Sequence, residues 1–111
     1  MTKRFAAIIL MFGVFLAASP LYAAGDASAG KDAYTKKCVS CHGKDGEGKD
    51  SIAAMLKIKF LHLGSKEVQA KSDADLKKIP IEGTGKMKPV KDVNDKMADD
   101  ITAYLRTLAK K

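Results

Sequence analysis

The chain has 111 residues, of which 30% are charged and 46% hydrophobic, with two cysteines, no tryptophan and a formal net charge of +7. This length suits one small domain, and so small a core usually needs an additional stabilising element such as a disulfide, a metal or a cofactor. The cations are nearly all dispersed lysines, without a basic run that carries interleaved aromatic residues, so the composition argues against nucleic acid as a partner.

Residues 1–24 have the organisation of a secretory signal peptide. A Lys-Arg pair precedes an apolar run over residues 5–18, and a Ser-Pro breaker leads into small residues that favour cleavage after Ala23 or Ala24. The run is shorter than the about 20 apolar residues that a membrane span needs, so an uncleaved anchor is the weaker alternative. We therefore expect an exported, periplasmic protein that does not span the membrane after cleavage. Residues 25–111 would form its domain, with a net charge of 7 − 2 = +5 once the two leader cations are removed.

A helix is predicted over residues 29–41, at the start of this domain. Asp26 and Ser28 are both suited to cap its N-terminus. Small and apolar residues recur on one face at helical spacing, and Gly43 suits the positive φ that often ends a helix. That face holds Gly30, Ala33, Tyr34, Cys38 and Cys41.

The end of this helix, Cys38-Val39-Ser40-Cys41-His42, reads C-x-x-C-H, which is the attachment signal for a c-type haem. On one side of a helical turn, Cys38 and Cys41 can form thioether bonds to the two vinyl groups of a haem. His42 can then offer an imidazole nitrogen to the iron. The motif predicts one covalently bound haem c, and attachment outside the cytoplasm agrees with an export signal.

Two other kinds of site compete for these residues. A disulfide or a thioredoxin-like redox pair uses C-x-x-C, but it needs no adjacent histidine and is expected in a βαβ context. A zinc site could recruit Cys38, Cys41, His42 and His62, but neighbouring Cys and His ligands crowd a tetrahedral centre. We favour the haem interpretation because the histidine is part of the motif.

The segment that follows the motif begins as a Gly-rich polar loop over residues 44–50. This loop lacks the pattern of a phosphate-binding loop and is interpreted as a turn region beside the cofactor. Residues 51–63 are apolar with interspersed lysines. We expect them to be partly helical and partly extended, and to form one wall of a haem crevice.

Three further helices are predicted toward the C-terminus. Two short ones cover residues 66–70 and 73–79, and Pro80 is expected to end the second. An aperiodic loop rich in Gly and Pro, residues 81–89, leads to the last helix over residues 95–109, and no strand signal is present. The last helix is capped by Asn94 and carries an apolar stripe of Met97, Ile101, Tyr104, Leu105 and Leu108.

A six-coordinate haem needs a second axial ligand, and four side chains of the domain could supply it. Met97 lies on the apolar stripe of the last helix and Met55 in an apolar run, so both are explained as core residues. Met87 is a lone hydrophobic residue in a Gly-Lys-Pro loop, where a flexible backbone can close over a cofactor. A thioether ligand there would favour Fe(II) and raise the potential relative to bis-histidine ligation. We predict Met87 as the ligand, with His62 as the alternative.

From Gly25 onward the chain resembles a class I cytochrome c of the small, single-haem bacterial type. The order of the features carries this resemblance as much as the motifs do: a haem motif early, a methionine loop late and a final helix after it. In such a protein the terminal helices cross, and Gly30 would let Tyr104 approach its backbone. The matching residues are Gly30 and Tyr34, Cys38 to Gly43, Gly85-Lys86-Met87 and Ile101 to Leu108.

The resemblance implies an all-α fold of about four to five helices wrapped around one covalently bound haem. It implies that Cys38 and Cys41 carry the haem, that His42 is the proximal iron ligand and that Met87 is the distal one. The chain departs from the family in one respect near the motif. Many members carry a proline whose carbonyl holds the proximal imidazole, and no proline follows His42 before Pro80.

The implied function is electron transfer and not enzymatic catalysis, with the iron cycling between Fe(III) and Fe(II). The partners would be redox proteins with acidic docking surfaces, which a monomeric carrier approaches through a basic rim. Two alternatives remain: a haem-based sensor or small peroxidase-like enzyme with a labile sixth ligand, and a haem-bearing subunit of a larger complex. Candidate rim residues are Lys37, Lys44, Lys86 and Lys88.

Overall fold

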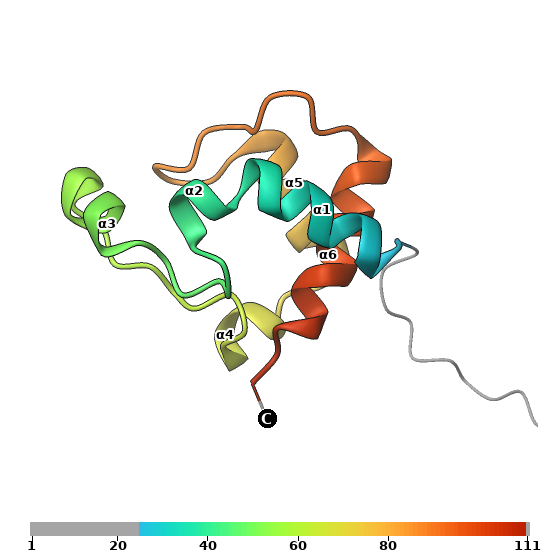
Figure 1. The fold of residues 1–111 in the computed structure, drawn as a ribbon, viewed down its shortest axis with the longest axis horizontal. Coiled ribbons are helices and arrows are strands. Elements are labelled where there is room, and N and C mark those ends of the chain that lie inside the picture. Colours follow the sequence, from blue (N-terminus) through green and yellow to red (C-terminus); the bar gives the residue numbers. More distant parts are fainter. Residues whose placement is uncertain (1–24, 111) are drawn as a thin grey trace, which may run out of the picture.

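The computed structural model describes residues 25–110, which form six helices and, within that range, no strand beyond one isolated bridge (Figure 1). The all-α prediction is confirmed. The predicted signal peptide, residues 1–24, lies outside the described residues and stays a prediction. None of the described helices is both long enough and apolar enough to cross a membrane. The helices are α1 (Ala27–Lys37), α2 (Val39–His42), α3 (Asp50–Leu56), α4 (Lys66–Gln69), α5 (Asp73–Glu82) and α6 (Asp95–Thr107).

The helix count exceeds the expected four to five because the predicted helix over residues 29–41 is divided. Cys38 is the C-cap of α1 and the N-cap of α2 at the same time. Of the two caps considered for α1, Asp26 is the one used, and its carboxylate accepts the backbone N–H of Ser28 at 2.8 Å. Asn94 caps α6 as predicted, accepting from the backbone N–H of Met97 at 2.8 Å.

The crossing of α1 and α6 at the centre of the molecule depends on Gly30 (Figure 1). A Cβ at this position would overlap the backbone carbonyl of Asp100 and would lie 3.0 Å from the Cβ of Tyr104. The predicted approach is therefore present, and the backbone of Asp100 is closer than Tyr104. The ring of Tyr34 packs on that of Tyr104, with centroids 5.2 Å apart. The core at this crossing consists of Ala33, Tyr34, Cys38, Ile101 and Leu105, with Met97 and Leu108 packed against it.

The prediction that Pro80 ends its helix is wrong. Pro80 lies inside α5, which continues to Glu82 and ends at Gly83, whose N–H donates to the carbonyl of Ile79 at 2.7 Å. A proline lacks a backbone N–H and its ring crowds the carbonyl four residues earlier, but near the end of a helix this disturbs a single ladder bond and the last turn can still form. The carbonyl of Pro80 accepts the N–H of Val90 at 2.8 Å. This bond fastens the loop that follows α5 to the end of that helix. We call this loop, residues 83–90, the distal loop.

The α3 helix stands apart from the other helices, at the tip of an excursion whose two legs run side by side (Figure 1). No residue of α3 is buried. After α3 the chain is non-helical up to Leu63, so the prediction of a partly helical and partly extended segment is confirmed. The N–H of Leu63 donates to the carbonyl of Gly46 at 2.9 Å, which closes the base of the excursion. We call residues 50–63 the α3 arm.

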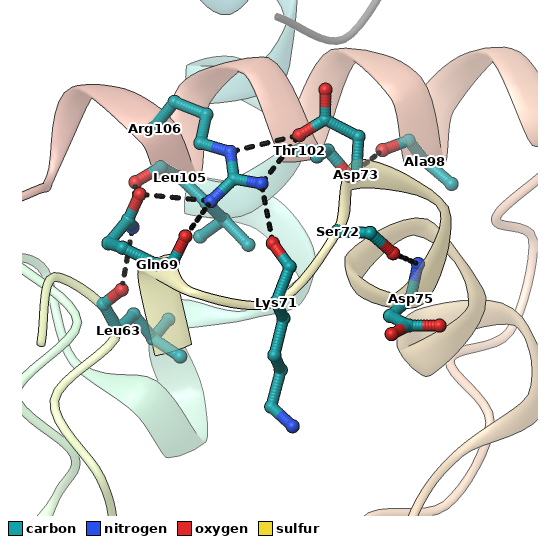
Figure 2. A network of polar contacts seen from close by, with 10 residues as sticks. All are labelled: Leu63, Gln69, Lys71, Ser72, Asp73, Asp75, Ala98, Thr102, Leu105 and Arg106. Carbon is teal, nitrogen blue, oxygen red and sulfur yellow. Dashed lines mark hydrogen bonds and ion pairs between the residues drawn. The ribbon is translucent and has the colours of Figure 1, made fainter. Parts of the chain in front are cut away.

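A polar network joins α6 to the connection between α4 and α5 (Figure 2). The guanidinium of Arg106 donates to Asp73 Oδ1 from Nε at 2.9 Å and from Nη2 at 2.7 Å, and to the carbonyls of Gln69 and Lys71, each at 2.8 Å. Only 16% of the Arg106 side chain is exposed. The amide of Gln69 in turn donates to the carbonyl of Leu63 at 2.9 Å. A single cation thus satisfies several polar groups and fixes the path of the chain behind the cavity described below.

Candidate haem site

The haem motif occupies the single turn of α2, directly after α1. The N–H of His42 donates to the carbonyl of Cys38 at 2.9 Å, and the N–H of Gly43 donates to that of Val39 at 2.9 Å. Gly43 ends the turn at φ 79°, as its predicted role as a helix cap requires. Since α1 is packed into the core through Tyr34, the motif begins from a rigid helix.

Three carbonyls at the end of α2, those of Cys41, His42 and Gly43, are bound by neighbouring groups. Two of the donors come from the Gly-rich loop. The N–H of Gly48 donates to the carbonyl of His42 at 2.6 Å, and the N–H of Lys49 donates to the carbonyl of Cys41 at 2.9 Å. The hydroxyl of Tyr34 donates to the carbonyl of Gly43 at 2.5 Å. Burial raises the pKa of Tyr34 well above its usual range, so this hydroxyl remains a neutral donor. The turn that presents the histidine is therefore held by three hydrogen bonds, two from the Gly-rich loop and one from α1.

An apolar cavity of about 350 Å³ opens beside this turn, within the range of roughly 300–1,000 Å³ that is typical of ligand pockets. Its wall comes from α1 and α6 at the centre, from the α3 arm on one side and from α5 and the distal loop on the other. The predicted crevice wall in residues 51–63 is present, although only its extended part contributes. The lining residues are Tyr34, Cys38, His42, Ile58, Lys59, Phe60, Leu61, Leu63, Val68, Lys71, Leu76, Ile79, Pro80, Thr84, Lys86, Met87, Ile101 and Leu105.

The imidazole of His42 lines this cavity. Burial lowers its pKa, which favours the neutral ring with one nitrogen lone pair free for a metal. Its Nδ1 atom is buried and has no hydrogen-bond partner among the described residues. The ring of Phe60 contacts it edge-on, with centroids 5.4 Å apart. A neutral imidazole in an apolar cavity fits an iron-bound cofactor, because metal ligation would use its free lone pair.

The two cysteines of the motif do not form a disulfide with each other. Cys38 is buried and lines the cavity, and burial raises its pKa to about 11. Cys41 is half-buried on α2 and is not among the lining residues. The zinc alternative lacks a ligand set, since nowhere in residues 25–110 do three or more Cys, His, Asp or Glu side chains come together so as to hold a metal ion.

The four candidate distal ligands lie in very different places. Met87 is half-buried and lines the cavity, whereas Met55 is 68% exposed on α3. Met97 packs against the core of the helix crossing, as predicted. His62 does not line the cavity, and its Nδ1 accepts the N–H of Gly64 at 2.9 Å. Of these four side chains, Met87 is thus the one that shares the cavity with His42.

Met87 is held by a tight turn that the sequence did not reveal. Thr84 and Met87 exchange two backbone hydrogen bonds, N–H to carbonyl in each direction, at 2.9 Å. Gly85 within the turn has φ 54°, a left-handed conformation that favours glycine. A Thr-Gly-Lys-Met segment could have suggested a turn, because glycine is a strong turn residue. Phe60 was predicted in a wall of the crevice and Gly48 and Lys49 in a turn beside the cofactor. Their contacts with the haem motif were missed, since only folding brings them together.

Comparison with known proteins identifies the family of the chain. Residues 25–105 match the family model described as cytochrome c oxidase, cbb3-type, subunit III, and the chain belongs to this family of c-type cytochrome domains. Among solved structures, it is similar to the KustC0563 c-type cytochrome, with a TM-score of 0.62 and 27% sequence identity over 73% of this chain and 98% of that chain. The search of curated proteins gave no match. The protein is a small c-type cytochrome, and this membership implies haem c as its cofactor and electron transfer to and from redox partners.

Proposed function

We propose that this cytochrome is a periplasmic carrier that moves one electron at a time between redox proteins on a single, covalently attached haem c. Cys38 and Cys41 would form the thioether bonds. His42 and Met87 would be the axial ligands of the iron. The haem supplies the chemistry, which is a reversible one-electron change between Fe(III) and Fe(II).

One observation carries this proposal: His42 and Met87 line the same apolar cavity, while Met55, Met97 and His62 do not. The cavity also includes Cys38 of the attachment motif. This arrangement supports ligation by a nitrogen and a thioether, and it argues against His62 as the sixth ligand. Since no Asp or Glu lines the cavity, the carboxylates usual in acid–base catalysis are missing from the walls that the structure describes.

The residues of the chain would act by holding the ligands still and keeping water away. The bonds that Gly48, Lys49 and Tyr34 make to the end of α2 would keep His42 in place through the change of oxidation state. Apolar side chains around the cavity would lower the local dielectric and so raise the potential. Little rearrangement on electron transfer is the expected consequence.

The proposed docking rim is smaller than the four predicted lysines. Lys37 donates to the carbonyl of Lys91 at 3.1 Å, and Lys86 donates to that of Leu56 at 2.5 Å. Both ammonium groups are therefore partly engaged within the protein. Lys44 and Lys88 are exposed and are the better candidates for meeting an acidic partner.

The proposal is tested by absorption spectra of the oxidised and reduced mature protein. We expect the weak near-infrared band of sulfur-to-iron charge transfer, and its loss in Met87→Ala but not in Met97→Ala. A low-spin spectrum without this band would leave the sixth site to another residue, and a high-spin spectrum would favour the sensor or peroxidase-like alternative. The mass of the protein from periplasmic extract tests export, with Ala24 or Gly25 as the expected first residue.

A second proposal is that the domain functions as a haem-bearing subunit of a larger assembly. It is favoured by the matched family, whose description is that of an oxidase subunit. Size-exclusion chromatography of native extract distinguishes the two. Elution of the haem absorbance at the size of the mature monomer supports the free carrier, and elution at a much larger size supports the subunit.

A further inference from the structure

Two segments that are far apart in sequence both line the cavity. Ile58 and Phe60 come from the α3 arm, and Thr84 and Met87 from the distal loop. A hydrogen bond from Lys86 Nζ to the carbonyl of Leu56 joins the two segments at 2.5 Å. It links residues 30 positions apart, and Lys86 itself is among the lining residues.

The acceptor of this bond is a group that needs a partner. Leu56 is the last residue of α3, and the last four carbonyls of a helix have no partner within it. The N–H of Lys57, at φ 54°, donates to the carbonyls of Ala53 and Ala54, and that of Ile58 also donates to Ala53. The Lys86 ammonium meets the carbonyl of Leu56 at the negative end of the helix dipole, where a cation is favourable.

The donor is placed by the turn that presents Met87. Lys86 lies between Gly85 and Met87 in the turn that Thr84 and Met87 close with two backbone hydrogen bonds. The contact that Lys86 makes with the arm is therefore transmitted to the turn that holds Met87. Within the arm, α3 itself has few other anchors, since none of its residues is buried.

We propose that Lys86 is a positioning residue for the sixth ligand. Its bond to Leu56 fastens the distal loop to the α3 arm, and the fastened loop holds the thioether of Met87 over the cavity. The inference rests on the proposed function, in which Met87 binds the iron. It assigns to Lys86 a role within the protein that Lys88, equally exposed and one residue beyond Met87, does not have.

The test compares haem-loaded Lys86→Ala with Lys88→Ala, which removes the same charge at the same distance in sequence from Met87. Imidazole added to the ferric protein displaces a weakly held sixth ligand, and its apparent affinity reports how readily the loop opens. The lost bond to a charged donor predicts an increase of about tenfold in imidazole affinity for Lys86→Ala. Lys88→Ala should stay within about twofold of the parent, and Lys86→Arg, which retains a cationic donor, should restore most of the difference.

Amide hydrogen exchange of the same proteins provides a readout that does not depend on the identity of the sixth ligand. In Lys86→Ala, the exchange rates should rise together in residues 54–58 and in residues 84–87. In Lys88→Ala, exchange should rise in neither segment. Unchanged exchange in both segments would overturn the tether. A coupled rise without a change in imidazole affinity would overturn the positioning role. Failure of the proposed ligand appears separately, as a missing sulfur-to-iron band in the parent protein, and the exchange result still decides whether Lys86 fastens the loop.

Discussion

The two sides of the cavity are built in different ways. On the proximal side, His42 lies at the end of a turn that follows a core helix, and the last carbonyls of that turn are bound by Gly48, Lys49 and Tyr34. On the distal side, Met87 lies in a four-residue turn of a loop. That loop is attached through Val90 to α5 and through a lysine side chain to the α3 arm.

We expect from this difference that the two proposed axial ligands are held with unequal strength. His42 directly follows a packed helix in a turn whose last carbonyls are bound, whereas a residue on a loop can leave by a local fluctuation. The distal half is therefore expected to open at lower cost than the proximal half. The experiments below change one half at a time.

The largest effect is expected at the crossing of α1 and α6. In Gly30→Leu, the new side chain would collide with the carbonyl of Asp100, and overpacking of this kind should lower the free energy of unfolding by about 3 kcal/mol. Gly85→Ala is the matched distal change. Its Cβ would meet nothing within 4 Å, so only the left-handed φ of 54° opposes it, at about 1 kcal/mol. Guanidinium unfolding of the haem-loaded proteins, followed by circular dichroism, measures both. Equal losses would contradict the rigid crossing.

A smaller effect is expected from the network around Arg106 (Figure 2). Arg106→Gln would remove the donors to Asp73 and to the carbonyls of Gln69 and Lys71, which should cost about 2 kcal/mol. Lys78→Gln is the control, since its pair with Glu82 is exposed and should contribute less than about 0.5 kcal/mol. Thermal unfolding of the two variants gives the comparison. A loss for Arg106→Gln as small as that for Lys78→Gln would mean that the network does not fix the chain behind the cavity.

The free energy of unfolding should also depend on pH, because Asp100 lies at the helix crossing. The N–H of Asp26 donates to Asp100 at 2.9 Å, and this bond, with the Lys96 ammonium at 3.2 Å, holds the pKa of Asp100 below its usual value. The stability from this carboxylate is fully present above the ordinary aspartate pKa of about 3.9 and is lost as the pH falls through the lowered folded value. Asp100→Asn should therefore be less stable than the parent at neutral pH, by a margin that narrows below about pH 4.

Unfolding curves from neutral pH down to about pH 3.5 measure this margin. Asp32→Asn, on an exposed position of α1, serves as the control for a lost surface charge. A margin for Asp100→Asn that stays constant over this range would show that its carboxylate does not contribute through ionisation.

The smallest effect, on rate and not on stability, distinguishes the two sides as docking surfaces. Lys44 on the proximal side is followed by Asp45 and Glu47, whereas Lys88 on the distal side has Lys86 and Lys91 as neighbours in the sequence. The distal rim is therefore the more positive, and Lys88→Glu should slow electron transfer to an acidic redox protein several-fold at low salt. Lys44→Glu should slow it less, and both effects should fade as salt screens the charges. Stopped-flow measurement of the oxidation rates of the two variants checks this order. Equal rates for Lys88→Glu and Lys44→Glu at low salt would contradict docking at the distal rim.

The proximal half was largely predictable from the sequence because it is local. The motif, the Gly43 cap, the Asn94 cap and the apolar stripe of α6 all follow from short spacings along the chain. The helix crossing could be predicted at Gly30, but the closer approach of Asp100 depends on the angle between the helices.

The distal half was predictable only in part, because its contacts join distant segments. The loop was assigned correctly, and Met87 lines the cavity as expected, while its role as a ligand remains a proposal. The continuation of α5 through Pro80 was missed, since the bond from Val90 to the Pro80 carbonyl forms only in the folded chain. The same holds for Lys86 and Leu56, and their contact changes the interpretation of Lys86 from a free rim residue to a tether.

The most direct test of this account is a guanidinium titration of the oxidised protein followed by two signals. The sulfur-to-iron band would report the proposed Met87 ligand, and far-ultraviolet circular dichroism reports the helices. We expect the band to disappear at a lower denaturant concentration than the helical signal, because the distal loop opens while the crossing of α1 and α6 remains intact. Coincident loss of the two signals would contradict the account, since the two halves of the cavity would then open as one unit.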